Sequence, residues 1–198
     1  MKFIKNNYLY LIFPLLSLIG AAWQGQFTND GYHWGFVFSN AIDLLEGKTP
    51  YREIFIEYGL ISTLLHAAIL KIFNLNIYSI IIFTSLLYSF SIYIIGKVTE
   101  EFTQSRKYAF FSTFIIFLIY PWPVSPWPNF ISFFLITIFC FFYTGKKKKD
   151  YIASGLSLAL AYLSFTIVYN FIITFFLLAL LIIILINYKK INYIILQK

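Results

Sequence analysis

The sequence predicts an all-α integral membrane protein, and three observations support that prediction. Of its 198 residues, 60% are hydrophobic and only 12% are charged, and the mean hydropathy is +0.78. A soluble domain is about a quarter charged, so this chain has too few charges for a surface that faces water. The apolar residues form long runs, and most basic residues lie between alternate runs. These features argue against a soluble enzyme, a disordered chain and a nucleic-acid binder.

Six apolar runs approach the roughly 20 residues that a helix needs to cross a bilayer. They are residues 8–24, 76–96, 108–122, 129–144, 151–164 and 170–187. The third and fifth runs are short unless their flanks contribute. We therefore expect about six transmembrane helices in a single module, residues 1–198, with a long loop over residues 25–75 between the first two helices.

The positive charges set the expected orientation. Twelve of the 15 basic residues lie in segments that alternate between the runs: Lys2, Lys5, Lys97, Arg106, Lys107, Lys146–Lys149, Lys189, Lys190 and Lys198. Such segments usually remain in the cytoplasm. Both termini are then cytoplasmic and the loop 25–75 faces outward. Heavy use of Ile, Phe, Tyr, Lys and Asn is typical of an AT-rich bacterial genome, so we expect the bacterial cytoplasmic membrane.

Two segments leave alternatives open. Residues 59–73 are apolar enough for a seventh span, but at 1.5 Å per residue they reach only about 22 Å, against a hydrocarbon core of about 30 Å. We expect a helix that lies at the interface, with His66 and Lys71 near the headgroups. Residues 1–22 also fit a signal peptide, although Pro14 and the length of the run suit an anchored first span equally well.

The outer loop differs from the rest of the chain in its charge. It holds five of the eight acidic residues, against three basic ones: Asp30, Asp43, Glu46, Glu53 and Glu57, with Lys48, Arg52 and Lys71. Long loops are often functional. We expect two juxtamembrane helices in it, one from about Asp30 to Glu46, capped by Asn29 and terminated by Gly47, and one over residues 59–73.

Several residues of this loop also have a purely structural interpretation. An acidic residue such as Asp30 at a helix start commonly caps the helix and neutralises its dipole. His33, in aromatic-rich surroundings, is more often a packing residue than a catalyst. Lys48 and Arg52 fit contacts with lipid phosphates, which is the usual role of basic residues at an interface.

Three short motifs follow one another in the outer loop. They are D-G-Y-H-W-G at residues 30–35, L-L-E-G-K-T-P-Y at 44–51 and I-E-Y-G-L-I-S-T-L-L at 56–65. Their order resembles the first outer loop of the GT-C membrane glycosyltransferases, most closely the protein-mannosyltransferase and aminoarabinose-transferase branch. That branch has an acidic residue just after the first span, a first juxtamembrane helix, a G-x-P-Y segment and a second juxtamembrane helix.

The resemblance implies an enzyme that moves a sugar from a polyprenyl-phosphate-linked donor to an acceptor hydroxyl on a glycan, lipid or protein at the outer face. Asp30 matches the catalytic position and would act as the general base. The residues that we expect to bind the substrates are His33, Lys48, Tyr51, Arg52, Glu53, Glu57 and Tyr58. Of these, the cations His33, Lys48 and Arg52, together with Lys71, are candidates to stabilise the leaving phosphate.

The sequence also departs from the branch. Gly31 follows Asp30 where relatives often carry a second acid, which weakens the case for a metal held by paired carboxylates. No cofactor is implied with certainty, and a divalent metal stays open. Asn129 stands where the branch typically has an acid. Relatives continue through further spans, so the resemblance implies a short or truncated N-terminal module, one half of a split enzyme with a partner chain, or a degenerate member.

Non-enzymatic alternatives stay open as well. The chain fits a six-span lipid-carrier-binding protein or transporter subunit, or a structural or assembly partner. A solute path would usually carry ionisable residues within its spans. The interiors of the expected spans contain Ser, Thr and Tyr but no charges. Chemistry confined to one outer loop therefore favours a surface enzyme over a transport path.

Overall fold

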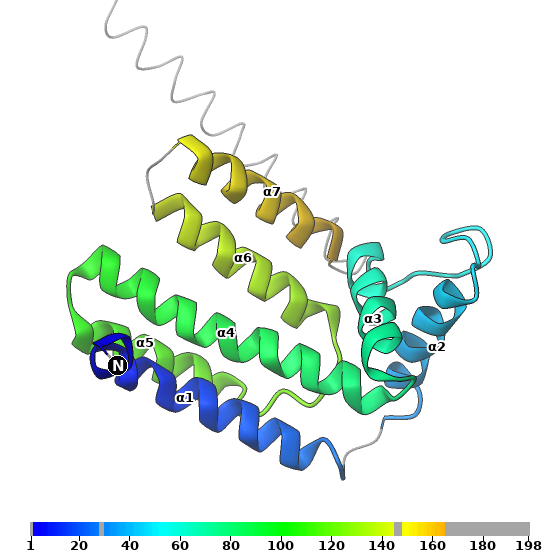
Figure 1. Ribbon diagram of the computed structural model, residues 1–198, viewed down its shortest axis with the longest axis horizontal. Coiled ribbons are helices and arrows are strands. Elements are labelled where there is room, and N and C mark those ends of the chain that lie inside the picture. Colours follow the sequence, from blue (N-terminus) through cyan, green and yellow to red (C-terminus); the bar gives the residue numbers. More distant parts are fainter. Residues whose placement is uncertain (1, 28–29, 145–147, 165–198) are drawn as a thin grey trace, which may run out of the picture.

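The computed structural model describes residues 2–27, 30–144 and 148–164, and the regular elements of this part of the chain are seven helices, without a strand (Figure 1). The helices are α1 (Lys2–Gln24), α2 (His33–Leu45), α3 (Leu60–Phe73), α4 (Ile77–Thr103), α5 (Arg106–Ile119), α6 (Pro128–Thr144) and α7 (Lys148–Ser164). The all-α prediction is confirmed for these ranges. The expected span over residues 170–187 lies outside the described residues.

Helix α4 is the centre of the bundle. It packs against α1, α5 and α6, and α7 packs on the far side of α6 (Figure 1). The pair α2 and α3 lies at one end of this layer, next to the first turns of α4. An apolar cluster of Ala41, Ala67, Leu70 and Ile80 joins α2, α3 and α4 there. The loop 25–75 is therefore held against the bundle by α2 and α3.

Among the described residues, α4 alone is long and apolar enough to cross a membrane, by length and composition. Shorter apolar helical segments are Tyr10–Gln24, Leu60–Phe73, Pro128–Thr144 and Ile152–Ser164. These findings give a hint of membrane association at α4, while the remaining crossings stay predictions.

The packing around α4 depends on small and hydroxylated residues. A Cβ atom added at Gly96 would lie 2.7 Å from Thr113 Cγ2 of α5, so the two helices approach closely there. The Ser85 hydroxyl donates to the carbonyl of Ile81 one turn earlier, at 2.8 Å, and lies 2.6 Å from the carbonyl of Pro123. This contact fixes the proline-rich segment between α5 and α6 against the bundle.

The helices of the loop 25–75 differ in detail from the prediction. Helix α2 begins at His33, three residues later than predicted, and ends before Gly47, whose φ of +87° confirms the predicted terminator. Helix α3 begins after Gly59, with a φ of +83°, and matches the predicted second juxtamembrane helix. Asn29, the predicted cap, lies outside the described residues.

The prediction that His66 lies near lipid headgroups is wrong. His66 is 1% exposed, and neither ring nitrogen has a hydrogen-bond partner among the described residues. Ser62, His66 and Leu70 recur every four residues and form the buried face of α3. Burial lowers the pKa of His66 to about 3, so the ring is neutral. Lys71, on the other face, is exposed as expected.

Candidate functional site

Asp30 lies between α1 and α2, where it caps the second helix. Its Oδ1 atom accepts hydrogen bonds from the backbone N–H groups of Tyr32 and His33, each at 3.1 Å. Asp30 therefore satisfies two backbone donors at the start of α2, as an N-terminal capping residue does. The second carboxylate oxygen makes no hydrogen bond within the described ranges. One oxygen thus holds the carboxylate in place and the other is available.

His33, the first residue of α2, bonds to a residue far along the chain. Its Nδ1 atom lies 2.8 Å from the hydroxyl of Tyr58, just before α3. Burial, followed by the negative charges of neighbours that include Glu57 and Asp30, raises the pKa of Tyr58, so the phenol keeps its proton. The structure thus brings together four of the predicted site residues, Asp30, His33, Glu57 and Tyr58, at the N-terminal end of α2.

Trp127 completes this cluster, and the sequence analysis missed it. Its ring centroid lies 5.2 Å from that of His33 and 5.9 Å from that of Tyr58. It belongs to the segment 120–127 between α5 and α6, which carries three prolines and is followed by a fourth, Pro128, at the start of α6. Prolines fix φ and stiffen a loop. A Trp in such a stiff segment is the sequence feature that could have marked Trp127 as a candidate site residue. Nothing in the local sequence says that this segment meets α2.

The other predicted binding residues lie at the opposite end of α2 (Figure 1). Helix α2 has 13 residues, which corresponds to about 20 Å of length. Beyond its C-terminal end lie Lys48, Tyr51, Arg52 and Glu53. A segment formed by Phe55–Tyr58 then returns along α2, where the Asn40 side chain donates to the Phe55 carbonyl at 3.0 Å. The eight predicted site residues therefore form two separate groups.

Within the second group, two charged side chains have local partners. Lys48 pairs with Asp43 at 2.5 Å and with Glu46 at 3.4 Å, and the bond to Asp43 contributes most to a raised pKa of Lys48. The Glu53 carboxylate accepts a hydrogen bond from the Thr49 backbone N–H at 2.7 Å, which lowers its pKa.

The remaining two residues of this group point away from the fold. Arg52 is exposed, and its side chain has no partner in the described part of the chain. Tyr51 is 62% exposed and has a φ of +62°, in the left-handed region. Lys48, Tyr51, Arg52 and Glu53 therefore form part of a surface loop. Arg52 is its cation without a partner among the described residues.

No group of three or more His, Cys, Asp or Glu side chains that could hold a metal ion occurs within the described ranges. Around Asp30, the nearest acid of the cluster is Glu57, and Gly31 supplies no ligand. The cluster is therefore a carboxylate next to a histidine–tyrosine pair.

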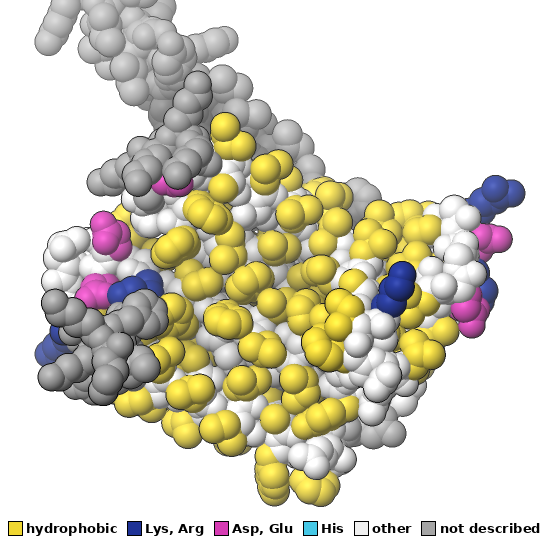
Figure 2. Space-filling view, viewed as in Figure 1, with side chains coloured by type: hydrophobic (Ala, Val, Ile, Leu, Met, Phe, Trp, Pro, Cys, Tyr) yellow, Lys and Arg dark blue, Asp and Glu magenta, His cyan; other side chains and the backbone are white. Residues whose placement is uncertain are grey.

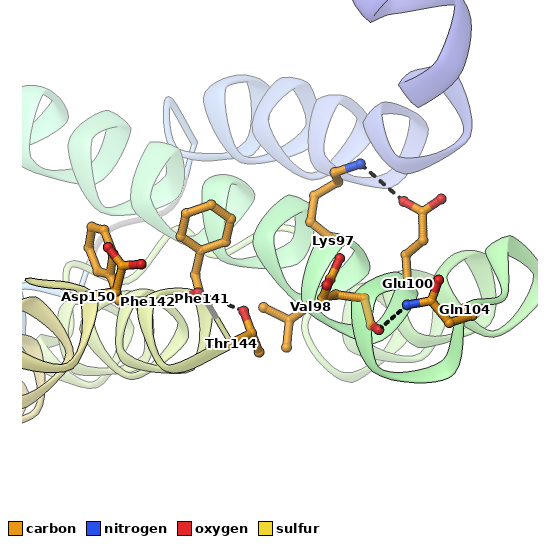
Figure 3. Close-up of a pocket in the computed structure, with 9 residues that line it drawn as sticks. Lys97, Val98, Glu100, Gln104, Phe141, Phe142, Thr144 and Asp150 are labelled. Carbon is orange, nitrogen blue, oxygen red and sulfur yellow. Dashed lines mark hydrogen bonds and ion pairs between the residues drawn. The ribbon is translucent and has the colours of Figure 1, made fainter. Parts of the chain in front are cut away.

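A second concave region lies at the far end of the bundle. There the ends of α4, α6 and α7 line an open pocket of about 610 Å³ (Figure 3). Lys97 pairs with Glu100 at 3.1 Å, and Arg106 reaches the same carboxylate at 3.3 Å. Glu101 and Asp150 also line the pocket. The adjacent segment 146–149 contributes four lysines, so this end of the bundle carries charges of both signs.

Comparison of the chain with protein-family models, with curated proteins and with solved structures found no significant match.

Proposed function

We propose that the chain is a membrane glycosyltransferase module that resembles the GT-C enzymes. In this proposal α1, α4, α5, α6, α7 and residues 170–187 cross the membrane, both termini are cytoplasmic, and the loop 25–75 faces outward. The surface supports this arrangement, because a broad apolar face covers the bundle and most charged side chains gather at two opposite edges (Figure 2). A membrane protein is expected to have such an apolar band between polar ends.

The proposed reaction takes place at Asp30. The acceptor hydroxyl oxygen attacks the anomeric carbon of the donor sugar, and the bond from that carbon to the phosphate oxygen breaks. The hydroxyl proton passes to the free oxygen of Asp30, and the polyprenyl phosphate leaves with the electron pair. A direct displacement of this kind inverts the anomeric configuration.

One observation carries the proposal: Asp30 is oriented through Oδ1, and its other oxygen makes no hydrogen bond to any residue in the described ranges. Two backbone N–H groups hold Oδ1 at 3.1 Å, six residues after the end of α1. A general base needs a fixed position and an accessible lone pair. The end of the first span is also the level at which a lipid-linked phosphate sugar would present its reactive carbon.

The same geometry gives some support to the non-catalytic alternative. An aspartate that caps a helix has a structural role that needs no chemistry. A lipid-carrier-binding protein or transporter subunit would use Asp30 only in that way. The two functions differ in what they predict for a variant that keeps the cap and loses the base.

Asp30→Asn is that variant, because Asn and Asp cap helices about equally well. We expect sugar transfer in membranes that contain the chain and a pool of polyprenyl-phosphate sugars to fall about 100-fold or more in Asp30→Asn, with unchanged expression. Asp43→Asn, which removes a carboxylate from the other end of α2, is the matched control and should retain transfer. Transfer at the wild-type rate in Asp30→Asn would contradict the assignment.

A further inference from the structure

The His33 ring is held on three sides although it lies at the surface end of α2. Its Nδ1 atom meets the Tyr58 hydroxyl at 2.8 Å. Trp127 packs on it at a centroid distance of 5.2 Å with an interplanar angle of 38°, and Tyr32 meets it edge-on at 5.0 Å. The hydrogen bond and the two ring contacts together fix the orientation of the His33 ring.

The direction of the hydrogen bond decides the chemistry of the ring. The Tyr58 phenol keeps its proton, and a neutral imidazole nitrogen is a better acceptor than a phenolic oxygen. When Tyr58 donates to Nδ1, the ring hydrogen lies on Nε2. Nε2 has no hydrogen-bond partner within the described residues, and it is not among the buried unpaired atoms. The pair therefore presents one N–H donor outward.

A donor at this place meets a requirement of the proposed reaction. The reacting carbon is bonded to a phosphate oxygen, so a base at the acceptor hydroxyl lies within a few ångströms of the phosphate. Asp30 and Glu57 would repel that phosphate unless a donor lay between them. Lys48 and Arg52 lie about 20 Å away, at the other end of α2. His33, whose backbone N–H donates to Asp30 Oδ1, carries a ring donor at the same end of α2 as Asp30.

We propose that Tyr58 is a positioning residue that fixes His33 as its Nε2–H tautomer, and that this N–H binds an oxygen of a lipid-linked phosphate. The inference rests on the proposed function. Trp127 has a supporting part, because its ring limits rotation of His33. A neutral donor can stabilise charge that develops on the leaving phosphate without changing its own protonation state.

The tautomer can be read directly by NMR, because the chain contains only two histidines, His33 and His66. The full chain, labelled with ¹⁵N-histidine, is studied in dodecyl maltoside micelles, which contain no phosphate. His33→Gln assigns the signals. We expect His33 to show a protonated Nε2 and an unprotonated Nδ1. A protonated Nδ1 would overturn the proposal.

Variants test the role of Tyr58. In Tyr58→Phe we expect the two His33 nitrogen signals to move toward each other, because both tautomers become populated. Tyr51→Phe removes an exposed phenol of the same loop and should change neither signal. Unchanged His66 signals show that the fold is intact. His33 signals that stay the same in Tyr58→Phe would overturn the positioning role.

Addition of farnesyl phosphate, and separately of inorganic phosphate, tests the ligand. Farnesyl phosphate should move the Nε2 signal of the wild type, with an affinity about three- to tenfold weaker in Tyr58→Phe, as expected for one hydrogen bond. No movement of Nε2, or equal affinity for inorganic phosphate, would overturn the lipid-linked assignment. These measurements need no sugar transfer, so the expected signals without transfer would contradict only the proposed function.

Discussion

At the end of the bundle where α4 terminates, Glu100 binds both Lys97 and Arg106, whereas at the α2 end Glu57 and Arg52 form no ion pair among the described residues. The first arrangement joins the ends of α4 and α5. The second leaves charges exposed around the Asp30 cluster and its loop. Charges that serve stability are expected to have partners, and charges that serve binding are expected to be available. Lys48, at the distal end of α2, has the ion partners Asp43 and Glu46 and so belongs to the first kind. The available charges of Glu57 and Arg52 support our proposal that the reaction takes place at the α2 side of the bundle.

The largest effect on stability is expected in the half of α4 that carries the ion pairs of Glu100. Gly96→Val should lower the free energy of unfolding by about 3 kcal/mol, because its Cβ would lie 2.7 Å from Thr113 and force α4 and α5 apart. Thermal unfolding in detergent measures the change. Gly155→Val, at a glycine with nothing within 4 Å, is the control and should change stability little. Equal losses in both variants would break the comparison.

A smaller effect on stability, with a larger effect on transfer, is expected at the α2 end. Asn40→Ala leaves the Phe55 carbonyl without its donor, which should cost about 2 kcal/mol and loosen the segment that carries Tyr58. We expect sugar transfer to fall further than the folded fraction does. Ser39→Ala, at an exposed position of the same helix, should leave both quantities unchanged. A fall in transfer that only follows the folded fraction would argue against this link.

The smallest effect concerns Glu53 in the distal part of the loop. Because its pKa lies below the usual value of 4.5, its bond to the Thr49 N–H is fully present above that value and is lost as the pH falls through the lowered pKa. The Thr49 amide resonance should therefore shift with a midpoint below pH 4.5, and Glu53→Gln should abolish the shift. A midpoint above pH 4.5 would contradict the hydrogen bond.

Much of the helical architecture could be predicted from the sequence, because apolar runs and glycine terminators act locally. The positions of α6 and α3 and the stop at Gly47 follow from such signals. The end of α4 could not be placed. The apolar run stops at residue 96, but the helix continues to Thr103, and the Lys97–Glu100 pair three residues apart stabilises the added turns.

The candidate site could be predicted only in part. The loop motifs singled out Asp30, His33 and Tyr58, but nothing local shows that residues 25 positions apart share a hydrogen bond. Trp127 joins from another loop. The burial of His66 could not be predicted for the same reason. The length of α3 suggested an interfacial helix, but the buried face of α3 depends on the packing of α2, α4 and α7 around it.

The central claim is that the two ends of the bundle face opposite sides of a membrane, with the Asp30 end outside. Cysteine labelling tests it most directly, because the single natural cysteine, Cys140, can be replaced by serine. Arg52→Cys and Glu101→Cys place a thiol at an exposed position near each end. We expect a membrane-impermeant maleimide to label Arg52→Cys in intact cells and Glu101→Cys only after lysis. Labelling of both variants in intact cells, or the reverse pattern, would contradict it.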